Sequence, residues 1–183
     1  MNPSPNLFLI GPTGAGKTSV GRRLAARLEL PFLDLDREIE TQTGVDVPTI
    51  FDIEGEAGFR QREAAMLDEL SQRHPIVLAT GAGAVLDADN RRRLAERGFV
   101  LWLDVGVDQQ IQRLQHDTQR PLLASADRRQ RLLDMALART PLYRDLANLR
   151  VPGHDEPVER ASERTLHLLD THWARTPTHS PSP

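Results

Sequence analysis

The sequence predicts an α/β fold: a central parallel sheet of five strands with helices on both faces. Short apolar runs alternate with segments of helical periodicity along the chain, and parallel strands need a crossover, usually helical, between them. A glycine-rich segment at residues 11–18 stands directly between the first apolar run and the first helical pattern. Because such sheets bind ligands beyond the carboxyl ends of their strands, functional residues are expected just after the apolar runs.

Each element is justified by its periodicity and its end signals. Gly98 is expected to close a helix in the left-handed conformation, and Thr140 and Pro141 to cap and restart one. Trp102 is expected in the core, and Trp173 to pack the last helix down. The expected strands are 7–10, 32–34, 76–79, 99–103 and 149–151, and the expected helices are 17–29, 37–43, 48–54, 56–73, 89–97, 107–116, 127–139 and 157–174.

Length and composition predict one domain over residues 6–174, with a lid at about 114–127 around the patternless break at 117–126. The ends, 1–5 and 175–183, are rich in proline and serine and are expected to be disordered. A net charge of −3 argues against nucleic acid or an anionic membrane as the main partner. The chain has no cysteine, no apolar run long enough for a membrane span and no recognisable secretory signal, so a cytoplasmic protein is expected.

The segment Gly11–Thr18 fits the phosphate-loop pattern GxxxxGK[ST]. Its glycines let main-chain N–H groups turn inward around an anion, and the following helix adds its positive end. Of the 23 basic residues only Lys17 is a lysine, and it occupies the position that reaches the β- and γ-phosphates. Thr18 takes the position of the Mg²⁺ ligand. The alternative, a glycine-rich turn before an ordinary helix, does not explain the retained lysine.

Phosphate-loop proteins often place an acidic residue near the metal at a strand end. The third expected strand has none there, so the candidates are Asp34 and Asp36 after the second strand and Asp104 after the fourth. Helix capping is the competing explanation for all three carboxylates. Two acids at i and i+2 can also divide the tasks, one holding metal-bound water and the other meeting a hydroxyl group.

At this point the sequence resembles the shikimate kinase family over about residues 6–151. The resemblance implies a three-layer P-loop kinase fold with a lid, and transfer of the ATP γ-phosphoryl group to the 3-hydroxyl of shikimate on the route to chorismate and the aromatic amino acids. The matching segments are GPTGAGKT (11–18), DLD (34–36), EAGFRQRE (56–63), GAG (81–83), RPLL (120–123) and RTPLYR (139–144).

Carried over residue by residue, the resemblance implies one Mg²⁺ per subunit, ATP as co-substrate and a monomer. Asp36 would hold the shikimate hydroxyl and act as base, and Asp34 would bind the waters of the metal that Thr18 ligates. Arg120 would close over the phosphates, and Arg113 would lie near adenine. The other ATP contacts would be Gly14, Ala15, Gly16, Lys17 and Ser19, and the other shikimate contacts Arg60, Gly81, Ala82, Gly83 and Arg139.

The residues themselves support part of this assignment. A small carboxylic acid needs cationic partners, and arginine binds a carboxylate through two parallel hydrogen bonds. Arg139 is expected at a helix break, where its side chain could be aimed out of regular packing. Arg60 and Arg62 flank the apolar stripe of their helix on opposite sides, and periodicity does not choose between them; only the resemblance selects Arg60. Arg120 precedes a proline in the expected lid.

The chain departs from the family pattern at Ala82, where the family has the middle of three glycines. If position 82 needed a positive φ, alanine would cost roughly 1 kcal/mol or more; otherwise it only adds a methyl group near the substrate. We expect weaker shikimate binding with little effect on ATP. The alternatives are another small-metabolite kinase, such as a gluconate kinase, and a nucleotide-binding module that has lost its chemistry.

Overall fold

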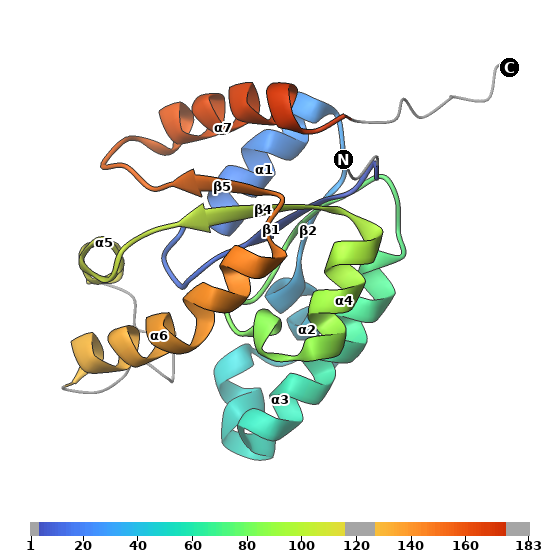
Figure 1. The fold of residues 1–183 in the computed structure, drawn as a ribbon. Coiled ribbons are helices and arrows are strands. Elements are labelled where there is room, and N and C mark those ends of the chain that lie inside the picture. The colour runs from blue at the N-terminus through green and yellow to red at the C-terminus, as the bar shows by residue number, and fades with distance from the viewer. Residues whose placement is uncertain (1–3, 116–126, 175–183) are drawn as a thin grey trace, which may run out of the picture.

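The computed structural model describes residues 4–115 and 127–174. Within them, five parallel strands form one sheet in the order β2-β3-β1-β4-β5 (Figure 1). The strands are β1 (Leu7–Ile10), β2 (Phe32–Asp34), β3 (Val77–Ala79), β4 (Phe99–Asp104) and β5 (Leu149–Pro152). The predicted five-stranded sheet is confirmed. β1 lies centrally, between β3 and β4, so the loop that follows it opens at the switch point where such sheets bind ligands.

Helices cover both faces of this sheet, as Figure 1 shows. One face carries α1 and α7, and the other carries α2, α3, α4 and α6. The bounds are α1 (Lys17–Leu28), α2 (Leu35–Thr43), α3 (Val47–Ser71), α4 (Ala88–Arg97), α5 (Val107–Arg113), α6 (Arg128–Leu146) and α7 (Val158–His172), with a short 3₁₀ helix at Ala84–Leu86. None of the described helices combines the length and the apolar character needed to cross a bilayer.

Strand alternation builds two separate cores. Phe8 and Ile10 of β1 point to the layer of α2, α3, α4 and α6, whereas Leu7 and Leu9 point to the layer of α1 and α7. All four side chains are fully buried. Trp102 lies in the first core and Trp173 in the second, where its ring stacks on Phe99 with the ring centroids 5.8 Å apart, so both tryptophan predictions are confirmed.

The two helices expected at 48–54 and 56–73 meet at Gly55, whose φ of 70° kinks α3. Two other predictions were wrong. Gly98 is extended, with a φ of −160°, and glycine is needed there because a Cβ would collide with the ring of Phe8. α6 also runs unbroken through Thr140 and Pro141. The buried residues on both sides of Pro141 keep α6 packed as one element, so tertiary packing prevails over the loss of one N–H donor.

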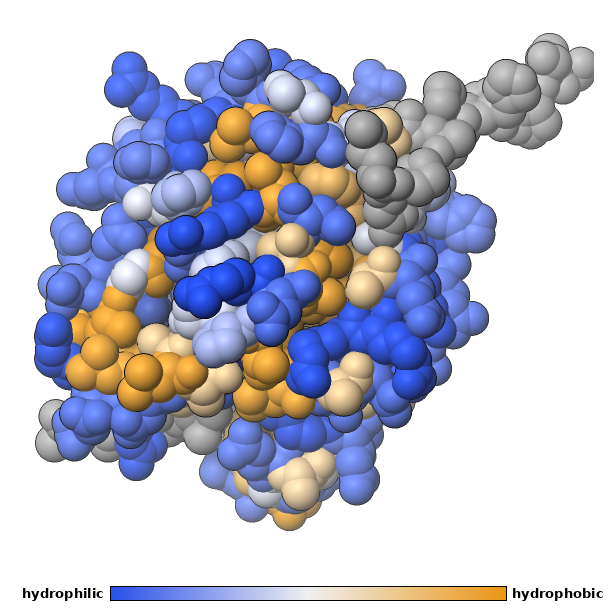
Figure 2. Space-filling view, in the orientation of Figure 1, coloured by the Kyte–Doolittle hydropathy of each residue, from blue (hydrophilic) through white to orange (hydrophobic). Residues whose placement is uncertain are grey.

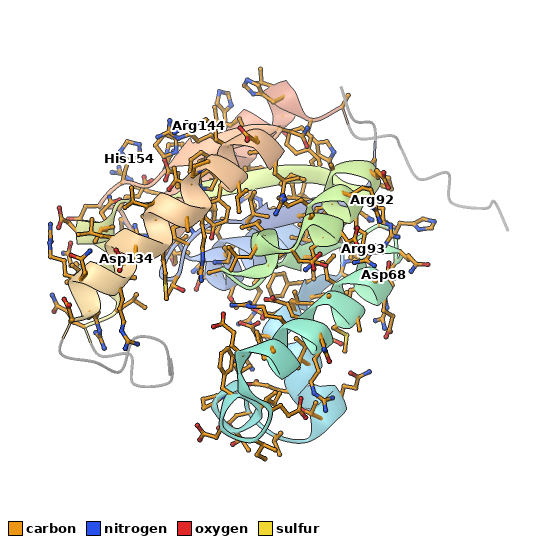
Figure 3. All side chains as sticks on the ribbon, turned by 60° about the horizontal axis from the view of Figure 1, so that its bottom comes forward. Asp68, Arg92, Arg93, Asp134, Arg144 and His154 are labelled. Atoms are coloured by element: carbon orange, nitrogen blue, oxygen red, sulfur yellow. The ribbon has the colours of Figure 1, made fainter. Side chains whose placement is uncertain are left out.

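Charged contacts tie α3 to α4 at the end away from Gly55. Figure 3 shows Asp68 of α3 and Arg93 of α4 facing each other, and their side chains lie 3.2 Å apart. Arg97 donates a 2.7 Å hydrogen bond to the same carboxylate and, together with Arg93, holds the pKa of Asp68 below its usual value. On α6, Leu133 and Leu137 are exposed, and Figure 2 shows hydrophobic residues at the surface over this helix.

Candidate active site

The phosphate loop leaves β1 and enters α1 through backbone conformations that favour glycine. Gly11, Gly14 and Gly16 have φ values of 142°, 76° and 87°. A Cβ at Gly11 would also collide with the carbonyl oxygen of Leu103 on the neighbouring strand. Because α1 begins at Lys17, its first N–H groups lie at the loop, where they have no partner within the helix. The strand, loop and helix predicted around residues 11–18 are confirmed.

The lysine ammonium group lies over this loop. Nζ of Lys17 donates hydrogen bonds of 2.8 Å to the carbonyl oxygen of Gly11 and 2.9 Å to that of Pro12. These contacts keep the cation at the concave side of the loop, where it can exchange carbonyl oxygens for phosphate oxygens. Ala15 is buried beside the loop, and Ser19 is exposed on the first turn of α1.

Thr18 and Asp34 are joined directly, although 16 positions separate them. Oγ1 of Thr18 donates a 2.6 Å hydrogen bond to Oδ2 of Asp34 at the end of β2. The same carboxylate caps α2 by accepting from the N–H of Arg37. The helix-capping explanation and the metal-side explanation for Asp34 are therefore compatible. Asp104 instead pairs with Arg150 at 2.6 Å.

These two oxygen groups fit a magnesium ion. Mg²⁺ in phosphate sites is usually held by one or two protein oxygens, the remaining positions going to water and phosphate. A hydroxyl and a carboxylate oxygen 2.6 Å apart beside the phosphate loop supply that donor set. Within residues 4–115 and 127–174, no three histidine or acidic side chains are grouped so that together they could hold a metal ion.

A second group of charges gathers around a buried carboxylate on α3. Glu63 is 1% exposed, and its Oε2 accepts a 2.6 Å hydrogen bond from Nη1 of Arg60. Arg60 also contacts Glu56 at 3.3 Å. Arg62 lies elsewhere, pairing with Glu54 at 2.6 Å. Of the two arginines that periodicity left open, Arg60 therefore lies at the buried carboxylate and Arg62 does not.

The turn after β3 lies against the same cluster, and two of its glycines leave room for side chains of that cluster. A Cβ at Gly81 would collide with Oε1 of Glu63 and lie 3.2 Å from Oδ1 of Asp36, and one at Gly83 would collide with the guanidinium of Arg60. The turn, Asp36, Arg60 and Glu63 therefore form one corner. Its position at the carboxyl ends of β2 and β3 agrees with the expected location of functional residues.

Burial sets the electrostatics of this corner. Desolvation raises the pKa of Glu63 above its usual value, although Arg60 and Arg139 act in the opposite direction and Asp36 adds to the rise. Burial opposes the charge of Arg60 as well, but Glu63 and Glu56 outweigh it and raise the pKa of Arg60. The corner thus contains the cationic guanidinium of Arg60 beside a carboxyl group that is costly to ionise, a setting that favours an additional anion.

Arg139 reaches this corner from α6. It is 9% exposed, and it lies inside the helix, so the expectation that it stands at a helix break was wrong. One pocket is lined by Arg139 and Tyr143 of α6, Trp102 of β4, and Pro12 and Thr13 of the phosphate loop. The arginine expected to bind a carboxylate and the loop expected to bind phosphates therefore share one pocket.

The departure at Ala82 causes no backbone strain. Among the described residues other than glycine, only Glu29 has a positive φ, so alanine adopts the conformation at position 82 freely. The carbonyl oxygen of Ala82 accepts a 2.5 Å hydrogen bond from the hydroxyl of Tyr143. The substitution thus leaves the geometry of the turn intact and adds only a methyl group.

Arg113, at the end of α5, bridges two loops. It donates hydrogen bonds of 3.2 Å to the carbonyl oxygen of Gly14 in the phosphate loop and 3.0 Å to that of His154 after β5. Arg113 therefore lies beside the phosphate loop, and its expected place near adenine stays a prediction. Arg120 and almost all of the expected lid at 114–127 lie outside the described residues.

Comparison with known proteins agrees with this geometry. The model of the family described as "Shikimate kinase" matches residues 13–170. The chain belongs to the shikimate kinase family. Shikimate kinases of Stenotrophomonas maltophilia and Pasteurella multocida are 48% and 47% identical to it, covering 96% and 90% of this chain and 97% and 95% of their own. The family match extends past residue 151, where the resemblance seen in the sequence faded.

Solved structures separate the shikimate kinase family from the alternative kinase. A shikimate kinase from Acinetobacter baumannii, in complex with shikimate, superposes with a TM-score of 0.89 and 44% identity over 93% of this chain and 95% of that one. A gluconokinase from Sinorhizobium meliloti gives a TM-score of 0.60 at 16% identity over 93% of both chains, which shows a shared fold alone.

Two residues of the site, Glu63 and Tyr143, were not singled out from the sequence. Each stood inside a segment that matched the family. Glu63 follows Arg60 by three positions and Tyr143 follows Arg139 by four, spacings that put each pair on one helix face. The spacing could have drawn attention to both, but it does not reveal that their polar atoms are buried.

Proposed function

We propose that this chain transfers the γ-phosphoryl group of ATP, with Mg²⁺, to the 3-hydroxyl of shikimate, giving shikimate 3-phosphate and ADP for chorismate and aromatic amino acid synthesis. The observation that carries the proposal is the shared pocket between the phosphate loop and Arg139, with Asp36 and Arg60 at the adjoining corner. A triphosphate and a small carboxylic acid would bind side by side there, as in-line transfer requires.

In the proposed reaction the protein acts by positioning and by charge. The guanidinium groups of Arg60 and Arg139 bind the shikimate carboxylate, and the turn of Gly81, Ala82 and Gly83 packs beside the ring. The carboxylate of Asp36 accepts a hydrogen bond from the reacting hydroxyl and takes its proton as the new O–P bond forms.

Charge on the transferring group is offset from the phosphate loop. Lys17 turns from its carbonyl partners toward the phosphate oxygens, which the amides of Gly14 to Ser19 also contact. Arg120 is proposed to approach the phosphates from the lid, and Arg113 to line the adenine site. Mg²⁺, when bound at Thr18 and through water at Asp34, neutralises phosphate charge. The hydrogen bond between these two residues supports that assignment.

The proposal includes a monomer in the cytoplasm that works on small molecules rather than on nucleic acid or membranes. The net charge of −3 supports the exclusion of nucleic acid and anionic membranes as main partners. Size-exclusion chromatography with light scattering tests the monomer.

A coupled ADP-release assay with shikimate, gluconate or no added acceptor tests the reaction. We expect turnover with shikimate, and rates with gluconate and with water that are at least about 100-fold lower, because a wrong acceptor leaves polar groups of the site unpaired at a cost of several kcal/mol. Faster turnover of gluconate would establish the alternative kinase. Binding of ATP without formation of ADP, whichever acceptor is added, would establish a nucleotide-binding module.

A further inference from the structure

Tyr143 occupies a position between the two substrate-facing parts of the proposed site. It lies one helical turn after Arg139 on α6, and its ring is 2% exposed. The ring stacks against Trp102 of β4 with the centroids 5.9 Å apart. This stacking sets the direction of the phenol, so its hydroxyl meets the turn after β3 instead of solvent.

The hydroxyl faces two groups, and their chemistry fixes to which of them it can donate. A guanidinium can only donate, so Arg139, whose charge acts on this hydroxyl, cannot accept its proton. The hydroxyl then donates its own proton to the carbonyl oxygen of Ala82 at 2.5 Å. Burial raises the pKa of Tyr143 far above its ordinary value, so the donor proton is retained at any working pH. One hydroxyl group therefore joins a side chain on α6 to the main chain of the turn.

The contact between Tyr143 and the turn affects both arginines that are proposed to bind the shikimate carboxylate, Arg60 and Arg139. Arg139 interacts directly with the hydroxyl, and its guanidinium carries five N–H donors for an acid. Arg60 is reached through the turn, because its guanidinium lies where a Cβ of Gly83 would stand. Moving the turn relative to α6 would therefore change the separation of the two guanidinium groups, and a bidentate clamp on a small acid depends on that separation.

We propose that the hydroxyl of Tyr143 is a positioning group for acid recognition, which holds Arg139 and the Gly81–Gly83 turn in register so that both arginines meet the carboxylate of the acceptor. The inference rests on the proposed function. It separates Tyr143 from a purely structural aromatic residue, for which ring packing alone would matter. Tyr143→Phe separates the two, because phenylalanine keeps the ring and its stacking and removes only the hydroxyl.

The test compares the full-length Tyr143→Phe variant with the wild type. We expect the Kd and the KM for shikimate to rise about tenfold, the cost of a buried acceptor left without its donor. The KM for ATP and kcat should stay within twofold. Ser162→Ala is the matched control, since it too removes a buried hydroxyl that donates to a main-chain carbonyl, at 2.6 Å, but on α7 across the sheet; both KM values should stay unchanged.

The outcomes keep the inference and the proposed function distinct. A wild type that does not phosphorylate shikimate would overturn the proposed function and the inference with it. A wild type that does so, beside a Tyr143→Phe variant whose Kd for shikimate is within twofold, would overturn the inference alone. Equal losses for both substrates together with a lower Tm would likewise assign Tyr143 to folding only.

A second measurement serves if Tyr143→Phe does not fold. Tyr143 is the one tyrosine in the chain, so protein labelled with 3-fluorotyrosine gives a single ¹⁹F resonance. We expect saturating shikimate, without nucleotide, to shift this resonance, and ADP alone to leave it in place. A resonance that does not respond to shikimate would overturn the inference.

Discussion

The two halves of the proposed site are built by different means. The phosphate half is one continuous segment, Gly11–Thr18, whose glycines at positive φ shape a main-chain loop around one lysine. The acid half is assembled from four distant segments that contribute Asp36, Arg60 with Glu63, the turn at 81–83, and Arg139 with Tyr143. The first depends on backbone conformation, and the second on buried side-chain charges that orient one another.

This difference teaches how each half tolerates change. A main-chain loop keeps its shape when neighbouring side chains vary, provided its glycines remain. A corner of buried charges is a coupled network in which removal of one member leaves another without its partner. We therefore expect single substitutions in the phosphate half to affect catalysis with little effect on stability, and substitutions in the acid half to affect both.

Lys17→Ala should give the largest effect. Its ammonium lies over the phosphate loop, held by two carbonyl oxygens of the loop, and electrostatic stabilisation of the transferring group commonly contributes about 10²–10³ in rate. We expect kcat to fall about 10³-fold, with a Tm close to that of the wild type. The ADP-release assay and thermal unfolding measure the two quantities. Residual activity above a tenth of wild type would break the assignment of the phosphate half.

The same contrast explains what could be predicted from the sequence. The sheet, its strand ends and the phosphate loop follow from local patterns, because apolar alternation and glycine spacing act over a few residues. The corner around Glu63 could not be predicted in this way, since its burial arises where α3, β3 and α6 meet. The helix break predicted at Pro141 was wrong for a related reason. The local preference of proline indicated a break, but packing on both sides of it kept α6 continuous.

A matched pair on α3 should give the next largest effect. Arg60→Lys keeps the positive charge beside Glu63 but loses the planar fork that binds a carboxylate at two points. We expect the KM for shikimate to rise about tenfold or more, because hydrogen bonds to charged groups contribute about 1.5–3 kcal/mol. Arg62→Lys changes only a surface ion pair with Glu54 and should leave the KM within twofold. Equal effects of the two variants would remove Arg60 from the site.

Glu63→Gln should change how stability depends on pH. Burial raises the pKa of Glu63 above 4.5 in the folded chain. Below about pH 4.5 the carboxyl group of Glu63 is protonated in the folded and in the unfolded chain. As the pH rises further, the unfolded chain loses this proton while the folded chain retains it, so stability falls until the folded carboxyl group ionises. Glutamine does not titrate, so the Tm of the variant relative to wild type should increase with pH above 4.5. A constant difference between the two Tm curves would contradict a raised pKa.

Ala82→Gly should give the smallest effect and the sharpest comparison within the acid half. A Cβ at either flanking glycine would collide with Arg60 or Glu63 where these side chains now lie, whereas position 82 accepts a methyl group without strain. If that methyl group crowds the acid, the KM for shikimate should fall about two- to threefold, with the KM for ATP unchanged. The Tm should fall slightly at the same time, because glycine adds unfolded-state entropy worth about 0.4–1 kcal/mol. A lower KM for shikimate together with a lower Tm in Ala82→Gly would show that this residue affects acid binding and stability in opposite directions. Equal KM values for shikimate would show that the methyl group does not reach the acid.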